Sequence, residues 1–146
     1  MSKKVLFLLV ILTLVLAACG GGGGGEKQSA APTTAAKAAV QGDPARGEKL
    51  FKQTTLGQAP GCITCHSLEE GKKLVGPSLA HVATEAEKYV KQGVAGSVDE
   101  YLHDSIVNPD KFVVEGYPKG VMYQNYGKDL SEQDIADLVA FLKTLK

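Results

Sequence analysis

The sequence predicts an all-α domain of about four to five helices over residues 42–146. Three observations support this class. Several segments of the region open with side chains that cap helix N-termini. The last segment repeats apolar residues at helical spacing. No run of alternating apolar and polar residues marks a convincing strand. The length suits one small domain, and no internal repeat divides it.

The first expected helix runs from Pro44 to about Thr54. Asp43 is a favourable N-cap, and proline suits the first helical position because its fixed φ fits the helix and its missing N–H is not needed there. Gly47 lies one turn before Phe51 on the same face. Since a glycine inside a helix lowers helix stability, this pair predicts the close approach of another helix.

Two further helices are expected in the middle of the domain. A capping box at Thr84–Glu87 opens a short helix that ends at Gly93. A second capping box at Ser97–Glu100 opens a helix that runs to about Asn108, because Pro109 cannot continue it.

The last expected helix begins at Ser131. Its apolar residues recur three and four positions apart, which places them on one face and predicts that this face packs into the core. They are Ile135, Leu138, Val139, Leu142 and Leu145.

The N-terminus has the features of an export signal. Lys3 and Lys4 precede an apolar run, Val5–Ala18, that is too short for a comfortable transmembrane helix. The run ends in small residues and Cys19, which resembles a bacterial lipobox. The resemblance implies a signal peptide over residues 1–18 and lipidation of Cys19, with the domain anchored at the extracytoplasmic face of a bacterial membrane (the periplasmic side or the outer cell surface). An ordinary signal peptide or an uncleaved anchor are the alternatives.

Residues 19–41 predict a flexible linker after the lipidated cysteine. Gly20–Gly25 is an unbroken glycine run, and residues 26–41 contain almost no large apolar side chain. About twenty such residues span roughly 25 Å on average and about 70 Å when stretched. The segment therefore either lets the domain move between partners or serves as a spacer.

The charge balance argues against a nucleic-acid partner. The chain has 16 basic and 16 acidic residues. Loss of Lys3 and Lys4 with the signal would leave 14 basic and 16 acidic residues, and no basic patch stands out in the sequence.

Cys62, Cys65 and His66 form a C-x-x-C-H motif, the pattern that attaches a c-type haem. Each thiol adds to one haem vinyl group, and the adjacent imidazole becomes the proximal ligand of the iron. A bare C-x-x-C redox pair would require a thioredoxin-like βαβ context, which the sequence does not suggest. A zinc site would require four ligands, and there is no second cysteine pair. The motif predicts one covalent haem c.

Residues 42–146 resemble a class I cytochrome c. A helix precedes C-x-x-C-H, Gly76–Leu79 follows it, a methionine loop comes late and a helix ends the chain. The resemblance covers the whole domain with its landmarks in order. It implies helices arranged around one covalent haem, with the first and last packed together through Gly47, Phe51 and Phe141.

The resemblance also implies roles for residues near the motif. Cys62 and Cys65 match the thioether positions, and His66 matches the proximal ligand. Pro77 matches the residue whose carbonyl accepts a hydrogen bond from the proximal imidazole and fixes its orientation. On its own, the Gly-Pro pair also fits a simple turn. Leu79 is expected to pack on the haem.

Met122 is the expected distal ligand. It is the only methionine outside the predicted signal, and it matches the family's ligand loop. A core gap-filler is the alternative role for it. His81 and His103 are competing distal ligands. The family usually has proline directly after the methionine, and Tyr123 at this place predicts a looser loop.

With both axial positions filled by protein, the iron would have no site for a substrate, and the domain would pass single electrons rather than act as an enzyme. The sequence therefore predicts a carrier, or a fixed subunit, between a quinol-oxidising respiratory or photosynthetic complex and a terminal acceptor. Its partners would be redox proteins and the membrane, with no small-molecule substrate. If Met122 leaves the iron easily, a gas sensor or a peroxidase-like enzyme is the alternative.

Overall fold

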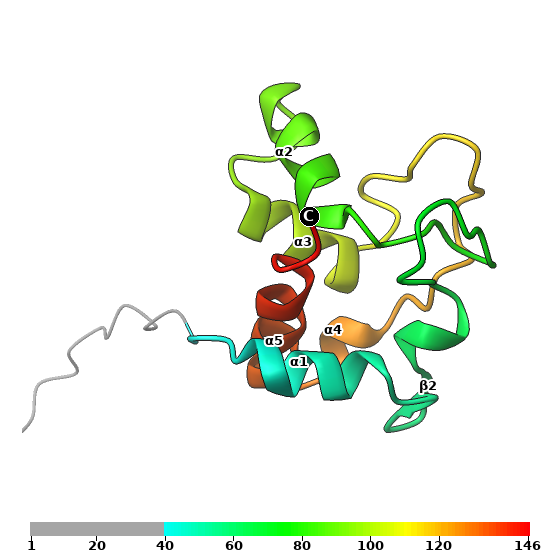
Figure 1. Cartoon of the computed structure of the whole chain (residues 1–146). Coiled ribbons are helices and arrows are strands. Elements are labelled where there is room, and N and C mark those ends of the chain that lie inside the picture. Colours follow the sequence, from blue (N-terminus) through cyan, green and yellow to red (C-terminus); the bar gives the residue numbers. More distant parts are fainter. Residues whose placement is uncertain (1–39) are drawn as a thin grey trace, which may run out of the picture. The chain divides into compact units, whose positions relative to one another are not determined.

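The computed structural model describes residues 40–146, so that the expected signal peptide, Cys19 and most of the linker lie outside the described residues. The expected all-α class is confirmed, with one short hairpin added (Figure 1). No helix within residues 40–146 has both the length and the apolar composition that crossing a membrane requires. The elements are α1 (Pro44–Phe51), β1 (Thr55–Leu56), β2 (Ala59–Pro60), the 3-10 turn η1 (Cys62–Thr64), α2 (Val82–Lys91), α3 (Val98–Val107), α4 (Tyr126–Asp129) and α5 (Glu132–Leu142).

The first and last helices, α1 and α5, cross in close contact (Figure 1). A Cβ atom added at Gly47 would lie 1.9 Å from the backbone oxygen of Asp137, so only glycine fits at this crossing. One turn further on, the rings of Phe51 and Phe141 pack with their centroids 5.6 Å apart. The predicted approach of another helix at Gly47, and the aromatic pair beside it, are confirmed.

A buried carboxylate lies at the same crossing. The side chain of Asp137 is completely buried. Its Oδ1 accepts hydrogen bonds from the backbone N–H of Asp43, at 2.7 Å, and from Nε2 of Gln133, at 2.9 Å. The Arg46 Nε lies 3.2 Å from Oδ2, within ion-pair distance but outside hydrogen-bond alignment. The start of α1 is therefore held to α5 by an ion pair to a buried carboxylate and by a hydrogen bond. Removing the partner of such a buried charge would strongly lower the stability of the fold.

Three helices begin where the sequence predicts. The side chains of Asp43 and Ser97 accept hydrogen bonds from backbone N–H groups in the first turns of α1 and α3. Ser131 and Asp134 form a complete capping box at the start of α5. In α3 the carboxylate of Glu100 accepts from the N–H of Gly96 rather than from Ser97, so that box is only half formed.

The predicted start of α2 is wrong. The helix begins at Val82, and its N-cap position is His81, which makes no side-chain capping bond. Ala83 is buried, and its N–H donates to the backbone oxygen of Leu145 at 3.0 Å. This contact with the end of the chain draws the residues before Thr84 into the helix, and no local signal predicts it.

The predicted end of α1 is also displaced. The helix ends at Phe51, because the oxygen of Thr54 accepts a hydrogen bond from the N–H of Gly61, at 2.9 Å, next to the β1–β2 hairpin. Gly57 turns the hairpin with φ of +61°. Gly93 follows α2 with φ of +75°, as expected for the glycine that ends that helix.

Replacing Gly47 with alanine tests the crossing of α1 and α5. The added methyl group would overlap the Asp137 backbone, so we expect a loss of about 3 kcal/mol in the free energy of unfolding. Thermal unfolding of the haem-loaded protein measures it. Gly96→Ala is the control, because only the mobile end of the Glu100 side chain lies near that position. Equal stability of the two variants would contradict the close crossing.

Candidate functional site

Residues from the whole length of the domain enclose a cavity of about 510 Å³. One wall holds the turn at Cys62–His66 and the segment 75–79, and another holds the loop 109–123. The inner faces of α2, α3 and α5 complete the lining, which is mostly apolar and aromatic. This size and lining suit one large, flat, apolar cofactor.

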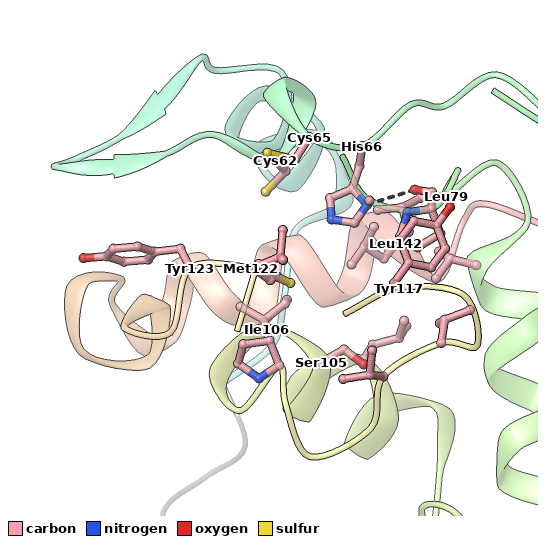
Figure 2. A pocket seen from close by; sticks show the side chains of 18 of the residues that line it. Cys62, Cys65, His66, Leu79, Ser105, Ile106, Tyr117, Met122, Tyr123 and Leu142 are labelled. Carbon is pink, nitrogen blue, oxygen red and sulfur yellow. Dashed lines mark hydrogen bonds between the residues drawn. The ribbon is translucent and has the colours of Figure 1, made fainter. Parts of the chain in front are cut away.

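The two thiols lie on one side of the cavity, together with the histidine that follows them (Figure 2). The oxygen of Cys62 accepts hydrogen bonds from the N–H of Cys65, at 3.1 Å, and from the N–H of His66, at 2.9 Å. These bonds wind the motif into a tight turn. The turn brings the two sulfur atoms and the imidazole to the same wall.

The surroundings of the thiols do not suit the alternative chemistries. Burial raises the pKa of the Cys62 thiol to about 11. A redox-active C-x-x-C pair needs the opposite shift, because the thiolate is the nucleophile. Within residues 40–146, no three His, Cys, Asp or Glu side chains gather closely enough to hold a metal ion between them. Neither a thioredoxin-like pair nor a zinc site is therefore supported by the described residues.

The His66 imidazole is held in one tautomer. Its Nδ1 lies 2.9 Å from the backbone oxygen of Pro77 (Figure 2), and since a carbonyl oxygen only accepts, Nδ1 carries the proton. Burial lowers the pKa of His66, and the Pro77 carbonyl opposes that shift in part. The ring is thus neutral at pH 7, with the Nε2 lone pair free to bind a metal.

Gly76 lets the backbone pass directly beside this ring. A Cβ atom at Gly76 would lie 2.4 Å from Cε1 of His66. The N–H of Gly76 donates to the oxygen of Cys65, at 2.9 Å, and the N–H of Leu79 donates to the oxygen of Ser67, at 2.8 Å. The Gly76–Leu79 segment is therefore fastened alongside the motif, with Leu79 in the cavity wall. The sequence predicts roles for Pro77 and Leu79 but none for Gly76.

Met122 reaches the cavity from the opposite side to the two cysteines and His66 (Figure 2). Its side chain is partly buried and packs against the core. Two side chains hold the backbone of the loop around it: the N–H of Gly120 donates to Asp110 Oδ1, at 2.9 Å, and Nε2 of Gln124 donates to the Met122 oxygen, at 2.7 Å. These bonds fix the backbone of the loop that brings the thioether to the cavity.

Tyr123 is anchored, against the expectation of a looser loop. Its ring turns away from the cysteine motif (Figure 2), and its hydroxyl donates to the carboxylate of Asp129 in α4. The ring also packs edge-on against Tyr126, with centroids 5.1 Å apart and an angle of 72°. Tyr126 in turn donates to the backbone oxygen of Pro60, just before the first cysteine. A tyrosine pair thus braces the loop where proline is usual.

The competing histidines lie elsewhere. The side chain of His81 is 47% exposed and lies 3.7 Å from Glu70, and that of His103 is 52% exposed beside Asp104. Neither histidine lines the cavity. Met122 is the sulfur-bearing side chain there that is not part of the cysteine motif.

The residues fit a covalent haem in three respects. The two thiols and an imidazole with a free lone pair share one wall, and a thioether reaches in from the other. Gly76 leaves the histidine ring the space that a side chain would fill. The hydroxyl of Tyr117 is buried in the cavity lining without a hydrogen-bond partner, as expected where a bound group supplies the partner.

Comparisons with known proteins agree with this geometry. The family model described as cytochrome c matches residues 44–146. A cytochrome c2 of Rhodopila globiformis is 33% identical over 119 residues, which cover 75% of this chain and 99% of that protein. A cytochrome c of Theileria annulata is 31% identical over 115 residues, covering 70% of this chain and 86% of that protein.

Gly76→Ala tests the packing beside His66. The new methyl group would displace the ring, so we expect a lower yield of chain with covalently attached haem and an unfolding free energy lower by about 2 kcal/mol. Mass spectrometry and thermal unfolding give the two values. Gly71→Ala is the control: it meets no neighbour within 4 Å and adds only backbone strain of about 1 kcal/mol at a positive φ. Equal haem yields in the two variants would refute the role of Gly76.

Proposed function

The chain belongs to the cytochrome c family and is an electron-transfer protein with covalent haem c, and from this premise we propose a membrane-tethered carrier of single electrons. It would link a quinol-oxidising respiratory or photosynthetic complex to a terminal acceptor, as a mobile carrier or as a subunit of such a complex. The observation that supports this proposal most is the pair of donor groups on opposite sides of one cavity, His66 and Met122.

The proposed roles follow the geometry. Cys62 and Cys65 would hold the haem covalently through their sulfur atoms, and His66 and Met122 would bind its iron. The Pro77 carbonyl orients the proximal ring through the bond at 2.9 Å. The haem supplies a one-electron couple when it is bound.

This chain's residues set the conditions for electron transfer. The bond from Nδ1 of His66 to the Pro77 oxygen makes the imidazole a better donor through Nε2. A thioether on the other side favours the ferrous state and raises the potential. The apolar lining excludes water, so that little solvent has to reorganise when the charge of the site changes.

Two of the residues that line the cavity are exposed apolar side chains. Val75 and Val121 both line it, and they are 55% and 51% exposed. Leu74, next to Val75, is 44% exposed. Such exposed apolar side chains suit contact with a redox partner in the small, brief encounters of electron carriers.

A gas sensor or peroxidase-like enzyme has less support. That alternative depends on a weakly held Met122, and it was suggested by Tyr123 in place of proline. The contacts of Tyr123 with Asp129 and Tyr126 provide another anchor for the loop.

Met122→Ala tests the distal ligand. We expect the oxidised variant to lose the weak sulfur-to-iron charge-transfer band, and the reduced variant to bind carbon monoxide, which the parent protein should not do. The midpoint potential should fall by at least about 0.1 V, because axial ligands move haem potentials over about 0.8 V. Val121→Ala, in the same loop, should retain the band. A parent protein without the band that binds carbon monoxide readily would overturn the carrier proposal.

Cys19→Ser tests the tether. The full chain with Cys19 should be recovered with membranes and should incorporate labelled fatty acid in a bacterial host. The serine variant should carry no label, because it lacks the sulfur that is acylated. Fatty-acid label in the serine variant, or none in the parent, would refute lipidation at this cysteine and leave the electron-transfer assignment intact.

A further inference from the structure

The Tyr117 hydroxyl is a polar group of the cavity for which the proposed mechanism has no use. We propose that it donates a hydrogen bond to a carboxylate of the haem propionates, and that Tyr117 is thereby a positioning residue for the cofactor. The proposal requires only that haem c is bound. It does not depend on the electron donor, the acceptor or the membrane tether.

The first argument is the energetic cost of the unpartnered hydroxyl. The Tyr117 oxygen is buried and has no hydrogen-bond partner among residues 40–146. A buried hydroxyl without a partner costs about 1–3 kcal/mol, so native structures rarely keep one. Asp137 Oδ2 is the other such atom, and it has the Arg46 ion pair beside it. Tyr117 is thus the case that requires a partner from outside the described residues.

Four other hydroxyls of the cavity lining already have acceptors. Ser78 donates to the oxygen of Glu69 and Ser105 to the oxygen of Tyr101, each at 2.7 Å. Tyr126 donates to the backbone oxygen of Pro60.

Tyr123 donates to the carboxylate of Asp129, on the side away from the cysteine motif. The protons of these four hydroxyls are therefore engaged within the protein. The proton of Tyr117 is free for a bound group.

The second argument concerns the charge of the lining. Glu85 and Asp110 are the ionisable acids among the described residues that line the cavity, and the lining contains no lysine or arginine. A carboxylate buried there has no cation beside it, so neutral donors have to stabilise it. The polar parts of a haem are its two propionates, and an O–H donor is complementary to an ionised carboxylate.

The position of Tyr117 in the chain links the cofactor to the Met122 loop. It lies in the loop that presents Met122, and its N–H donates to the oxygen of Val114 at 3.2 Å. A bond from the Tyr117 hydroxyl to the haem would fasten this loop to the cofactor at a second point besides the thioether. Loss of this hydrogen bond should therefore change both the surroundings of the haem and the stability of the fold.

Tyr117→Phe in the haem-loaded protein tests the proposal, because it keeps the ring and removes only the hydroxyl. We expect the melting temperature to fall by about 5 °C or more, since a bond to a charged acceptor is lost. The carboxylate bands in the redox-difference infrared spectrum should shift. The midpoint potential should fall, because a less compensated negative charge favours ferric iron.

Tyr126→Phe is the matched control. It removes a hydroxyl from the same cavity lining that donates to the Pro60 oxygen. This variant should also lose stability, but its carboxylate bands should stay unchanged.

Two outcomes for Tyr117→Phe would overturn the proposal. An unchanged or higher melting temperature would mean that the hydroxyl is unpartnered even with haem bound. A lower melting temperature with unshifted carboxylate bands would mean that its partner is water or the protein.

Discussion

The close crossing of α1 and α5 is the contact on which the rest of the fold depends. It is possible because Gly47 presents no side chain to the Asp137 backbone. One hairpin separates α1 from the C-x-x-C-H turn, and one short helix, α4, separates the Met122 loop from α5. Bringing the two helices together therefore brings together the two walls of the cavity, which lie far apart in the sequence. The buried, paired Asp137 carboxylate adds specificity to this crossing, because a shift would leave a charge without its partners.

The cavity explains why the fold and the cofactor belong together. A domain of this size has a modest core of its own, and here the inner faces of Leu102, Leu138 and Phe51 border a cavity of about 510 Å³. An apolar cavity that large would be very costly if nothing filled it. A covalent haem both supplies the missing core and carries the redox chemistry, so stability and function rest on the same apolar lining.

The two sides of the cavity are held in different ways. On the His66 side the backbone itself forms the support, with Gly76 against the ring and the Pro77 oxygen on Nδ1. The Met122 side is a loop, and side chains brace it. Tyr123 at the position where the family usually has proline replaces a backbone restraint with an aromatic contact and a hydrogen bond to α4. Substitutions on the loop side should therefore tune the ligand more readily than those on the histidine side.

The sequence by itself determined the features whose cause is local or covalent. The spacing of Cys62, Cys65 and His66 is dictated by haem attachment, and the caps of α1, α3 and α5 depend on neighbouring residues alone, so both could be predicted. Gly47 predicted the close approach of another helix, because a glycine inside a helix lowers helix stability and such an approach explains its presence. Only the tertiary structure decided the earlier start of α2, the role of Gly76 and the anchoring of Tyr123. The start of α2 depends on the Leu145 oxygen at the far end of the chain, and Gly76 and Tyr123 depend on contacts made across loops, with His66 and Asp129. Local propensity carries no information about such partners.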